Sequence, residues 1–198
     1  MTPTFWSPRI AALEPYVPGE QPRIANLVKL NTNENPYPPS PRTIDAIQRA
    51  AEEGLERYPD PESTALREAI AARHGLQAGQ VFVGNGSDEV LAHAFFAFFQ
   101  QDAPLLLPDI TYSFYRVYAQ LYGIACELQP VDEALRIDAG ALAARARAGC
   151  AGIVVANPNA PTGRGLPLAH IETLLAVCPE RVVLVDEAYV DFGGQSAL

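Results

Sequence analysis

Short apolar runs alternate with amphipathic segments over the second half of the chain. The apolar runs of strand length are 81–83, 104–107, 124–128, 153–156 and 182–185. The segments with helical spacing of apolar residues are 87–99, 111–122, 138–147 and 167–177. Strands that alternate with helices are typical of βαβ units with right-handed crossovers. The pattern therefore predicts an α/β fold: a three-layer αβα arrangement around a mostly parallel sheet.

The first 45 residues follow a different pattern, because nine prolines fix φ and remove backbone donors. They predict an extended arm, interrupted by a short strand at 28–30. Two helices are expected after it, at 42–53 and at 63–74. Ser63 is the expected N-cap of the second helix, and Gly75 its terminator.

Composition narrows the class of protein. A formal charge of −9 offers no basic stripe for phosphates, so we expect no nucleic-acid partner. The longest apolar run, 90–99, is interrupted by His93 and is too short to cross a bilayer. The three cysteines show no metal-ligand spacing, and no signal-peptide pattern opens the chain. These features predict a cytoplasmic protein that binds neither a membrane nor a metal.

The first candidate binding loop is Val-Gly-Asn-Gly-Ser-Asp-Glu at 83–89. A strand, two glycines and the start of a helix can direct backbone N–H groups and the positive helix end at one anion. The expected ligands of that anion are Gly86, Ser87 and Asp88, with the Asp88 carboxylate turned away as a cap. Ordinary helix capping explains the same residues without a ligand.

Two further loops follow strands of the same sheet. Tyr112 opens a helix after the 104–107 strand, where its ring could stack on a planar ligand. Two prolines and a glycine constrain the loop 156–163, so Asn157 and Asn159 could present rigid amides to a fixed oxygen. The neighbouring aromatic residues Phe114, Tyr115 and Tyr118 are expected mainly to pack the helix.

Asp186 ends the apolar run 182–185, and Tyr189 follows three residues later. A carboxylate at the end of a fully buried parallel strand is costly unless it is paired. A pyridinium N–H would pair with it and hold the ring protonated, while Tyr189 could donate to a phenolic oxygen of that ring. The alternatives are an arginine ion pair or an N-cap for Asp186, and core packing for Tyr189.

Five motifs in this order resemble the fold-type I pyridoxal-phosphate-dependent aminotransferases, and among them the histidinol-phosphate aminotransferases. The motifs are LNTNENP at 30–36, RYPD at 57–60, GNGSDE at 84–89, NPNAPTG at 157–163 and DEAY at 186–189. The resemblance covers the whole chain. It implies an arm and the start of a small domain at 1–45, and the first part of the pyridoxal-phosphate-binding large domain at 46–198.

The resemblance also assigns roles. It implies that Gly86, Ser87 and Asp88 bind the cofactor phosphate, that Tyr112 stacks on the ring, and that Asp186 and Tyr189 bond its nitrogen and 3-oxygen. Tyr58 would reach the phosphate of a neighbouring subunit in a homodimer with shared active sites. Tyr16 and Asn33 would lie near the substrate. The implied reaction transfers an amino group between histidinol phosphate (to imidazole acetol phosphate) and 2-oxoglutarate (to glutamate), in histidine biosynthesis.

Two positions depart from the family pattern. Ala160 stands where most relatives have the asparagine that bonds the 3-oxygen, so Asn157 or Asn159 must replace it, or the bond is absent. The single lysine, Lys29, lies in the arm, whereas the family's Schiff-base lysine follows Asp186 and Tyr189. We therefore expect no catalytic residue in this chain, and interpret it as the N-terminal half of an enzyme whose lysine lies beyond Leu198.

Three other functions stay open. An aromatic aminotransferase or a threonine-phosphate decarboxylase would use the same cofactor loops. A non-catalytic pyridoxal-phosphate-binding module would need an attached DNA-binding segment, and neither a helix-turn-helix nor a basic patch is found in the sequence.

Overall fold

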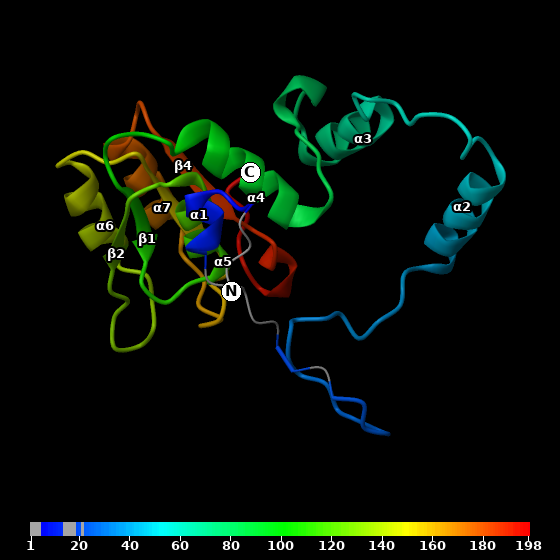
Figure 1. Ribbon diagram of the computed structural model, residues 1–198, viewed down its shortest axis with the longest axis horizontal. Helices are drawn as coiled ribbons and strands as arrows, with labels where there is room; N and C mark the ends of the chain where they lie inside the picture. Colours follow the sequence, from blue (N-terminus) through cyan, green and yellow to red (C-terminus); the bar gives the residue numbers. More distant parts are fainter. Residues whose placement is uncertain (1–4, 14–18, 21) are drawn as a thin grey trace. The chain divides into compact units, whose positions relative to one another are not determined.

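The computed structural model describes residues 5–13, 19–20 and 22–198 (Figure 1). The chain divides into two compact units. We call Met1–Glu14 with Gly84–Leu198 the sheet unit, and Pro15–Val83 the α2–α3 unit. The boundary between the two units lies between Val83 and Gly84. Each unit is described by itself.

The sheet unit is built on four parallel strands (Figure 1). The strands are β1 (Leu105–Pro108), β2 (Cys126–Gln129), β3 (Gly152–Ala156) and β4 (Val182–Asp186), in the order β2-β1-β3-β4. All three pairings are parallel, and Ala156 pairs with Asp186 at the carboxyl ends of β3 and β4. The predicted mostly parallel sheet is confirmed, and its strand ends meet at one edge.

Helices cover both faces of this sheet. Their bounds are α4 (Gly86–Phe98), α5 (Phe114–Tyr122), α6 (Ala139–Ala146) and α7 (Leu168–Val177). Leu105 and Leu107 of β1 pack with residues of α4 and α5, whereas Leu106 packs with residues of α6 and α7. Side chains of a strand alternate between faces, so these two clusters are the two cores of an αβα sandwich.

Two predictions about strands are wrong. Residues 28–30 and 81–83 form no strand. The carbonyl of Val81 accepts instead from Nε of Arg67 at 2.9 Å, which places it outside any ladder. The expected full burial of 182–185 is also wrong, because β4 pairs only with β3 and stays half-buried at the edge of the described sheet.

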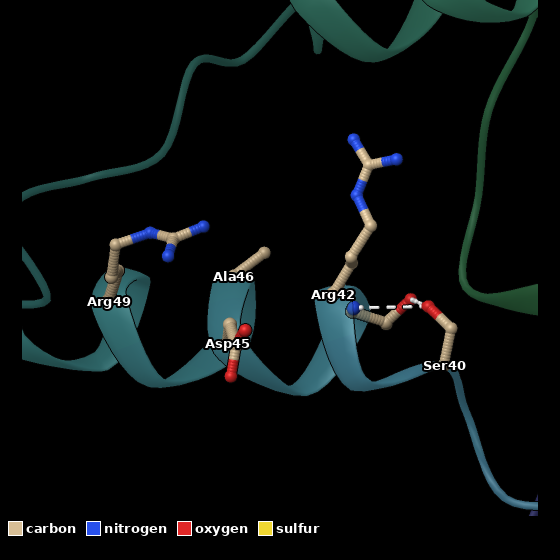
Figure 2. Close-up of a pocket in the computed structure, with 6 residues that line it drawn as sticks. Ser40, Arg42, Asp45, Ala46 and Arg49 are labelled. Carbon is tan, nitrogen blue, oxygen red and sulfur yellow. Dashed lines mark hydrogen bonds between the residues drawn. The ribbon is translucent and has the colours of Figure 1, made fainter.

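The α2–α3 unit contains α2 (Pro41–Glu52), α3 (Thr64–His74) and the 3₁₀ turn η1 (Ala78–Gln80). Ser40 caps α2, because its Oγ accepts from the backbone N–H of Thr43 at 3.2 Å (Figure 2). Pro41 occupies the first turn. Arg42 and Arg49 project from the same helix (Figure 2), and both line a hollow on the surface of this unit.

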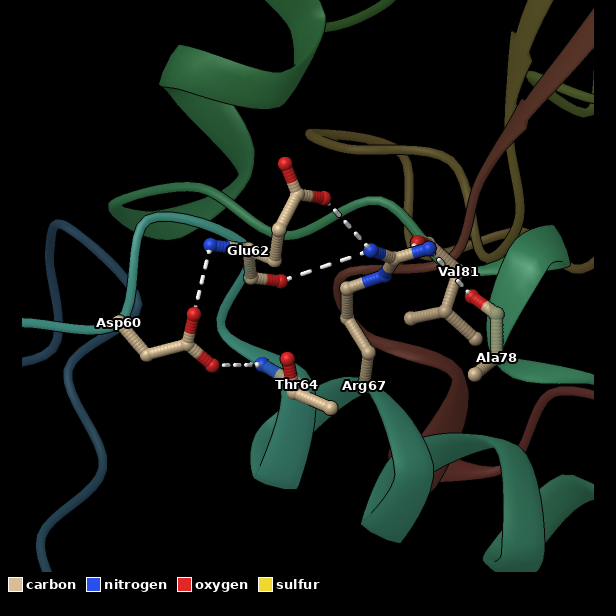
Figure 3. A network of polar contacts seen from close by, with 6 residues as sticks. All are labelled: Asp60, Glu62, Thr64, Arg67, Ala78 and Val81. Atoms are coloured by element: carbon tan, nitrogen blue, oxygen red, sulfur yellow. Dashed lines mark hydrogen bonds and ion pairs between the residues drawn. The ribbon is translucent and has the colours of Figure 1, made fainter.

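The start of α3 differs from the prediction. Ser63 adopts φ +48° and makes no side-chain cap. Asp60 supplies the cap: its carboxylate accepts from the backbone N–H groups of Glu62 at 3.0 Å and Thr64 at 2.7 Å (Figure 3). These bonds lower the pKa of Asp60. Gly75 ends α3 at φ +68°, as predicted.

Arg67 ties α3 to the residues that follow it. Its guanidinium donates to the carbonyls of Val81 and Ala78, each at 2.9 Å, and pairs with Glu62 at 3.2 Å (Figure 3). Arg67 thus satisfies backbone groups that no strand partner serves.

Besides η1, two short elements were not predicted. These are α1 (Pro8–Ala11), inside the expected extended arm, and the 3₁₀ turn η2 (Val190–Phe192). No helix in the described part of the chain combines the length and apolarity that crossing a bilayer requires.

Candidate functional site

A pocket of about 200 Å³ lies in the sheet unit, where the loops after β1, β3 and β4 meet the first turn of α4. Its walls are formed by Ser87, Asp88, Tyr112, Ala156, Ala160, Asp186, Ala188 and Tyr189. Five of these residues are predicted site residues that come from three separate segments of the sequence. The carboxyl edge of a parallel sheet is where α/β proteins bind ligands.

The first turn of α4, where an anion site is predicted, forms one end of the pocket. Gly86 holds φ +77°, and a Cβ at Gly84 would lie 2.9 Å from Oε2 of Glu89. That carboxylate accepts from the backbone N–H of Asn85 at 2.5 Å and so caps the helix. The following N–H groups lie in the turn where helical donors lack intrahelical partners. With the Ser87 hydroxyl, this turn can bind a phosphate.

Asp88 does not cap the helix, contrary to the expectation. Its Oδ1 accepts from the hydroxyls of Tyr112 at 3.0 Å and Tyr118 at 3.3 Å, and the Tyr118 hydroxyl also donates to the Asp88 carbonyl at 2.9 Å. Burial, followed by the charge of Asp88, raises the pKa of Tyr118. Asp88 therefore fixes the two tyrosines, and one of them lines the pocket.

Tyr112 presents a half-buried ring to the pocket. Its hydroxyl is held by Asp88, and its ring meets Tyr115 edge-on with centroids 5.4 Å apart. Contacts at the hydroxyl and at the ring edge define the orientation of the ring. A planar ligand in the pocket could stack on it.

Asp186 lies at the end of β4 and is held on both carboxylate oxygens. Oδ2 accepts from the hydroxyl of Tyr115 at 2.7 Å, and Oδ1 accepts from the backbone N–H of Ala188 at 3.0 Å. None of the ion pairs formed by the described residues involves Asp186, so the arginine alternative finds no support. Each oxygen keeps a second lone pair that a ligand N–H can use.

The two asparagines of the 157–163 loop do not line the pocket, which corrects the expectation that they face a ligand oxygen. Both are buried. Asn157 accepts from the N–H of Leu166 at 2.8 Å and donates to the carbonyl of Gln195 at 3.2 Å. Asn159 bonds Ile110, Thr111 and Thr162. Their amides hold the loop that carries Ala160 into the wall.

The remaining predicted residues lie elsewhere. Asn33 and Tyr58 belong to the α2–α3 unit, where both are exposed. Tyr16 falls outside the described residues. Lys29, also in the α2–α3 unit, forms an ion pair with Glu34. The structure therefore leaves the roles proposed for these residues untested.

Tyr115 is the pocket-related residue that the sequence did not reveal. It is fully buried, and burial followed by the charge of Asp186 raises its pKa. The helical spacing of the aromatic residues indicated core packing only. The sequence does not show which tyrosine hydroxyl bonds Asp186, because that depends on how α5 crosses the sheet.

The fold and the pocket together define the class: this is the αβα architecture of the fold-type I aminotransferases, with the first turn of a helix, an aromatic ring and a carboxylate around one pocket. Residues 25–198 match the family "Aminotransferase class I and II", and the chain belongs to it.

Curated relatives narrow the comparison within that family. The chain is 59% identical to the histidinol-phosphate aminotransferase of Gluconacetobacter diazotrophicus over 98% of its own length and 53% of that protein. It is 58% identical to histidinol-phosphate aminotransferase 2 of Rhizobium meliloti, over 98% of this chain and 54% of that one. The chain thus spans about half the length of these relatives.

A solved structure supports the same comparison. Histidinol-phosphate aminotransferase from Sinorhizobium meliloti in complex with pyridoxal-5'-phosphate superposes with a TM-score of 0.74 and 26% identity. The superposition covers 84% of this chain and 46% of that one.

Proposed function

We propose that the complete gene product is a pyridoxal-phosphate-dependent aminotransferase that moves an amino group between histidinol phosphate and 2-oxoglutarate in histidine biosynthesis. "Complete gene product" means this chain together with any residues that its gene encodes after it. The observation that carries the proposal is the meeting of Ser87, Asp88, Tyr112, Asp186 and Tyr189 in one pocket. The names of the two curated relatives described above supply the substrate.

The pocket residues fit pyridoxal phosphate. The cofactor has a phosphate, a flat aromatic ring and a basic ring nitrogen, and the pocket offers an anion-binding turn, an aromatic face and a carboxylate. Three alanines (Ala156, Ala160 and Ala188) complete the wall and leave room for a ring. When bound, the cofactor supplies an electron sink for the carbanion that forms at the substrate's Cα.

Each pocket residue then has a defined task. The first turn of α4 and the Ser87 hydroxyl bind the phosphate. Tyr112 orients the ring by stacking, and Asp186 holds a proton on the ring nitrogen by pairing with the N–H. Tyr189 donates to the 3-oxygen. The amides of Asn157 and Asn159 bond groups within the protein, so Tyr189 is the proposed donor to that oxygen.

The reaction also needs a lysine, both as covalent anchor and as the base that moves the Cα proton. The sheet unit contains none, and Lys29 is paired with Glu34 in the α2–α3 unit. We propose that a Ser-Lys pair encoded after Leu198 supplies it. Reading the gene beyond that codon tests this directly, and an immediate genuine stop codon would favour a non-catalytic module.

The remaining proposals concern partners. A homodimer would let Tyr58 of one subunit reach the cofactor phosphate of the other, with Tyr16 and Asn33 near the substrate. Sedimentation analysis of the complete gene product tests the dimer. Tyr58→Phe should weaken cofactor binding while the dimer stays intact.

The activity test offers four amino substrates to the complete gene product with pyridoxal phosphate and 2-oxoglutarate. Glutamate formation with histidinol phosphate is the expected result. Glutamate formation only with tyrosine or phenylalanine would identify an aromatic aminotransferase, and CO₂ release from threonine phosphate a decarboxylase. Cofactor binding without any turnover would refute the enzymatic proposal.

A further inference from the structure

Tyr115 connects the packed core to the pocket. It lies in the first turn of α5, 71 residues before Asp186 in the sequence, and no part of it is exposed. Its ring stacks on Phe95 with centroids 6.1 Å apart, and it meets Tyr112 edge-on. These two ring contacts and the full burial restrict the movement of the ring and of its hydroxyl.

That hydroxyl is one of two donors that hold the carboxylate of Asp186. It lies 2.7 Å from Oδ2, while the N–H of Ala188 lies 3.0 Å from Oδ1. With one donor on each oxygen, rotation of the carboxylate is restricted. Asp186 is also anchored through its main chain, because its carbonyl accepts from the N–H of Asn157 at 2.8 Å.

The hydrogen bond between Tyr115 and Asp186 affects the protonation of both groups. The Tyr115 hydroxyl stays protonated at any working pH, since burial and the adjacent negative charge raise its pKa. It acts as a donor, and a donor to a carboxylate favours the ionised form over the protonated form. A carboxylate stabilised in this way competes less for the proton that it shares with a ring nitrogen.

We propose that Tyr115 is a positioning residue that fixes the Asp186 carboxylate and keeps the shared proton on the ring nitrogen of the bound cofactor. This inference rests on the proposed function. It adds that the strength of the electron sink is set by a tyrosine that does not line the pocket. A simple packing role for Tyr115 would need only its ring.

Tyr115→Phe separates the two roles, because it keeps the ring and removes the hydroxyl. The matched control is Tyr122→Phe on the same helix. Tyr122 is half-buried, packs edge-on against Phe96 at 5.5 Å, and does not line the pocket. Both variants are made in the complete gene product and loaded with pyridoxal phosphate labelled with ¹⁵N in the ring.

The expected result has two parts. In Tyr115→Phe, the ¹⁵N signal of the ring nitrogen moves toward the unprotonated position, and kcat falls about tenfold or more, the size expected for losing a hydrogen bond to a charged group. KM for the amino substrate stays within about twofold, because Tyr115 makes no substrate contact in this proposal. Tyr122→Phe matches the wild type in all three measurements.

Substitution by 3-fluorotyrosine at position 115 provides a second variant that retains the hydroxyl. Fluorine makes the hydroxyl a stronger donor, so the ¹⁵N signal should move in the opposite direction from that of Tyr115→Phe. The ¹⁵N signal of this variant tests the proposal even if Tyr115→Phe does not fold.

The outcomes distinguish the two proposals. If the wild type binds pyridoxal phosphate and turns over, but neither change at position 115 moves the ¹⁵N signal, the inference is refuted and the proposed function stands. If the wild type does not bind pyridoxal phosphate, the proposed function fails, and the inference fails with it.

Discussion

Asn159 gives the most informative structural prediction, because its buried amide joins two of the loops that form the pocket. Its Oδ1 accepts from the hydroxyl of Thr111 at 2.8 Å, and its Nδ2 donates to the carbonyl of Ile110 at 2.9 Å and to Thr162 at 3.1 Å. Asn159 is 1% exposed, so water cannot replace these bonds where it lies. Asn159→Ala removes all of them.

The magnitude follows from the number and burial of these bonds. Each net hydrogen bond contributes about 1 kcal/mol, and leaving a buried partner unsatisfied costs about 1–3 kcal/mol. Asn159→Ala should therefore cost about 2–4 kcal/mol. Asn159→Asp should cost at least as much, because both donations, to the Ile110 carbonyl and to Thr162, are lost and a buried carboxylate oxygen would face the Ile110 carbonyl.

Hydrogen exchange detected by mass spectrometry measures the loss where it occurs. In Asn159→Ala, amides of 110–112 and 159–163 should exchange about thirtyfold faster or more, as a loss of about 2 kcal/mol implies. Glu172→Ala, on the exposed face of α7, is the control and should leave these rates unchanged. Unchanged exchange in Asn159→Ala would refute the view that this amide holds the loops together.

Four further predictions concern the complete gene product. Asp186→Asn should keep the circular dichroism spectrum and lower kcat by orders of magnitude, because a neutral amide cannot hold the ring nitrogen protonated. Ser87→Ala should weaken pyridoxal phosphate binding about tenfold or more and leave pyridoxal binding unchanged, as fluorescence titration would show. Gly152→Ala should lower the free energy of unfolding by about 1–3 kcal/mol in urea, because a Cβ would lie 2.5 Å from Phe99. Burial, followed by the neighbouring Cys150, raises the pKa of Cys178 to about 11 in the folded state. The folded protein therefore favours the protonated thiol more than the unfolded chain does. The free energy of unfolding should fall as the pH rises from about 9 to about 11.

These predictions have separate controls. Gly79→Ala, where a Cβ would meet nothing within 4 Å, should change stability less than Gly152→Ala. Cys178→Ala should reduce the alkaline loss of stability, and an identical pH dependence in this variant would contradict the assignment to Cys178. Near-normal turnover of Asp186→Asn, or equal losses for pyridoxal and its phosphate in Ser87→Ala, would remove those residues from their proposed roles.

Local patterns predicted the elements of the sheet unit well. The runs 153–156 and 182–185 are strands, because an apolar run ending at a turn fits the interior of a parallel sheet. The same pattern failed at 81–83, where the backbone bonds Arg67 instead of another strand. Whether an apolar run becomes a strand depends on a partner that lies far away in the sequence.

The site was predicted in part for the same reason. Loops that follow parallel strands meet at one edge, so Ser87, Tyr112 and Asp186 could be grouped from the sequence. The direction in which each side chain points could not be predicted from the sequence. Asn159 turns into the protein and Tyr115 reaches Asp186, and both follow from the packing of α5 and of the loop after β3.

The position of the ring nitrogen is the most direct test of the central claim, and a crystal structure of the complete gene product with pyridoxal phosphate would show it. We predict a ring nitrogen about 3 Å from a carboxylate oxygen of Asp186, with the phosphate at the first turn of α4. A cofactor bound with its phosphate away from Ser87, or with its ring nitrogen facing no carboxylate, would contradict the proposed site.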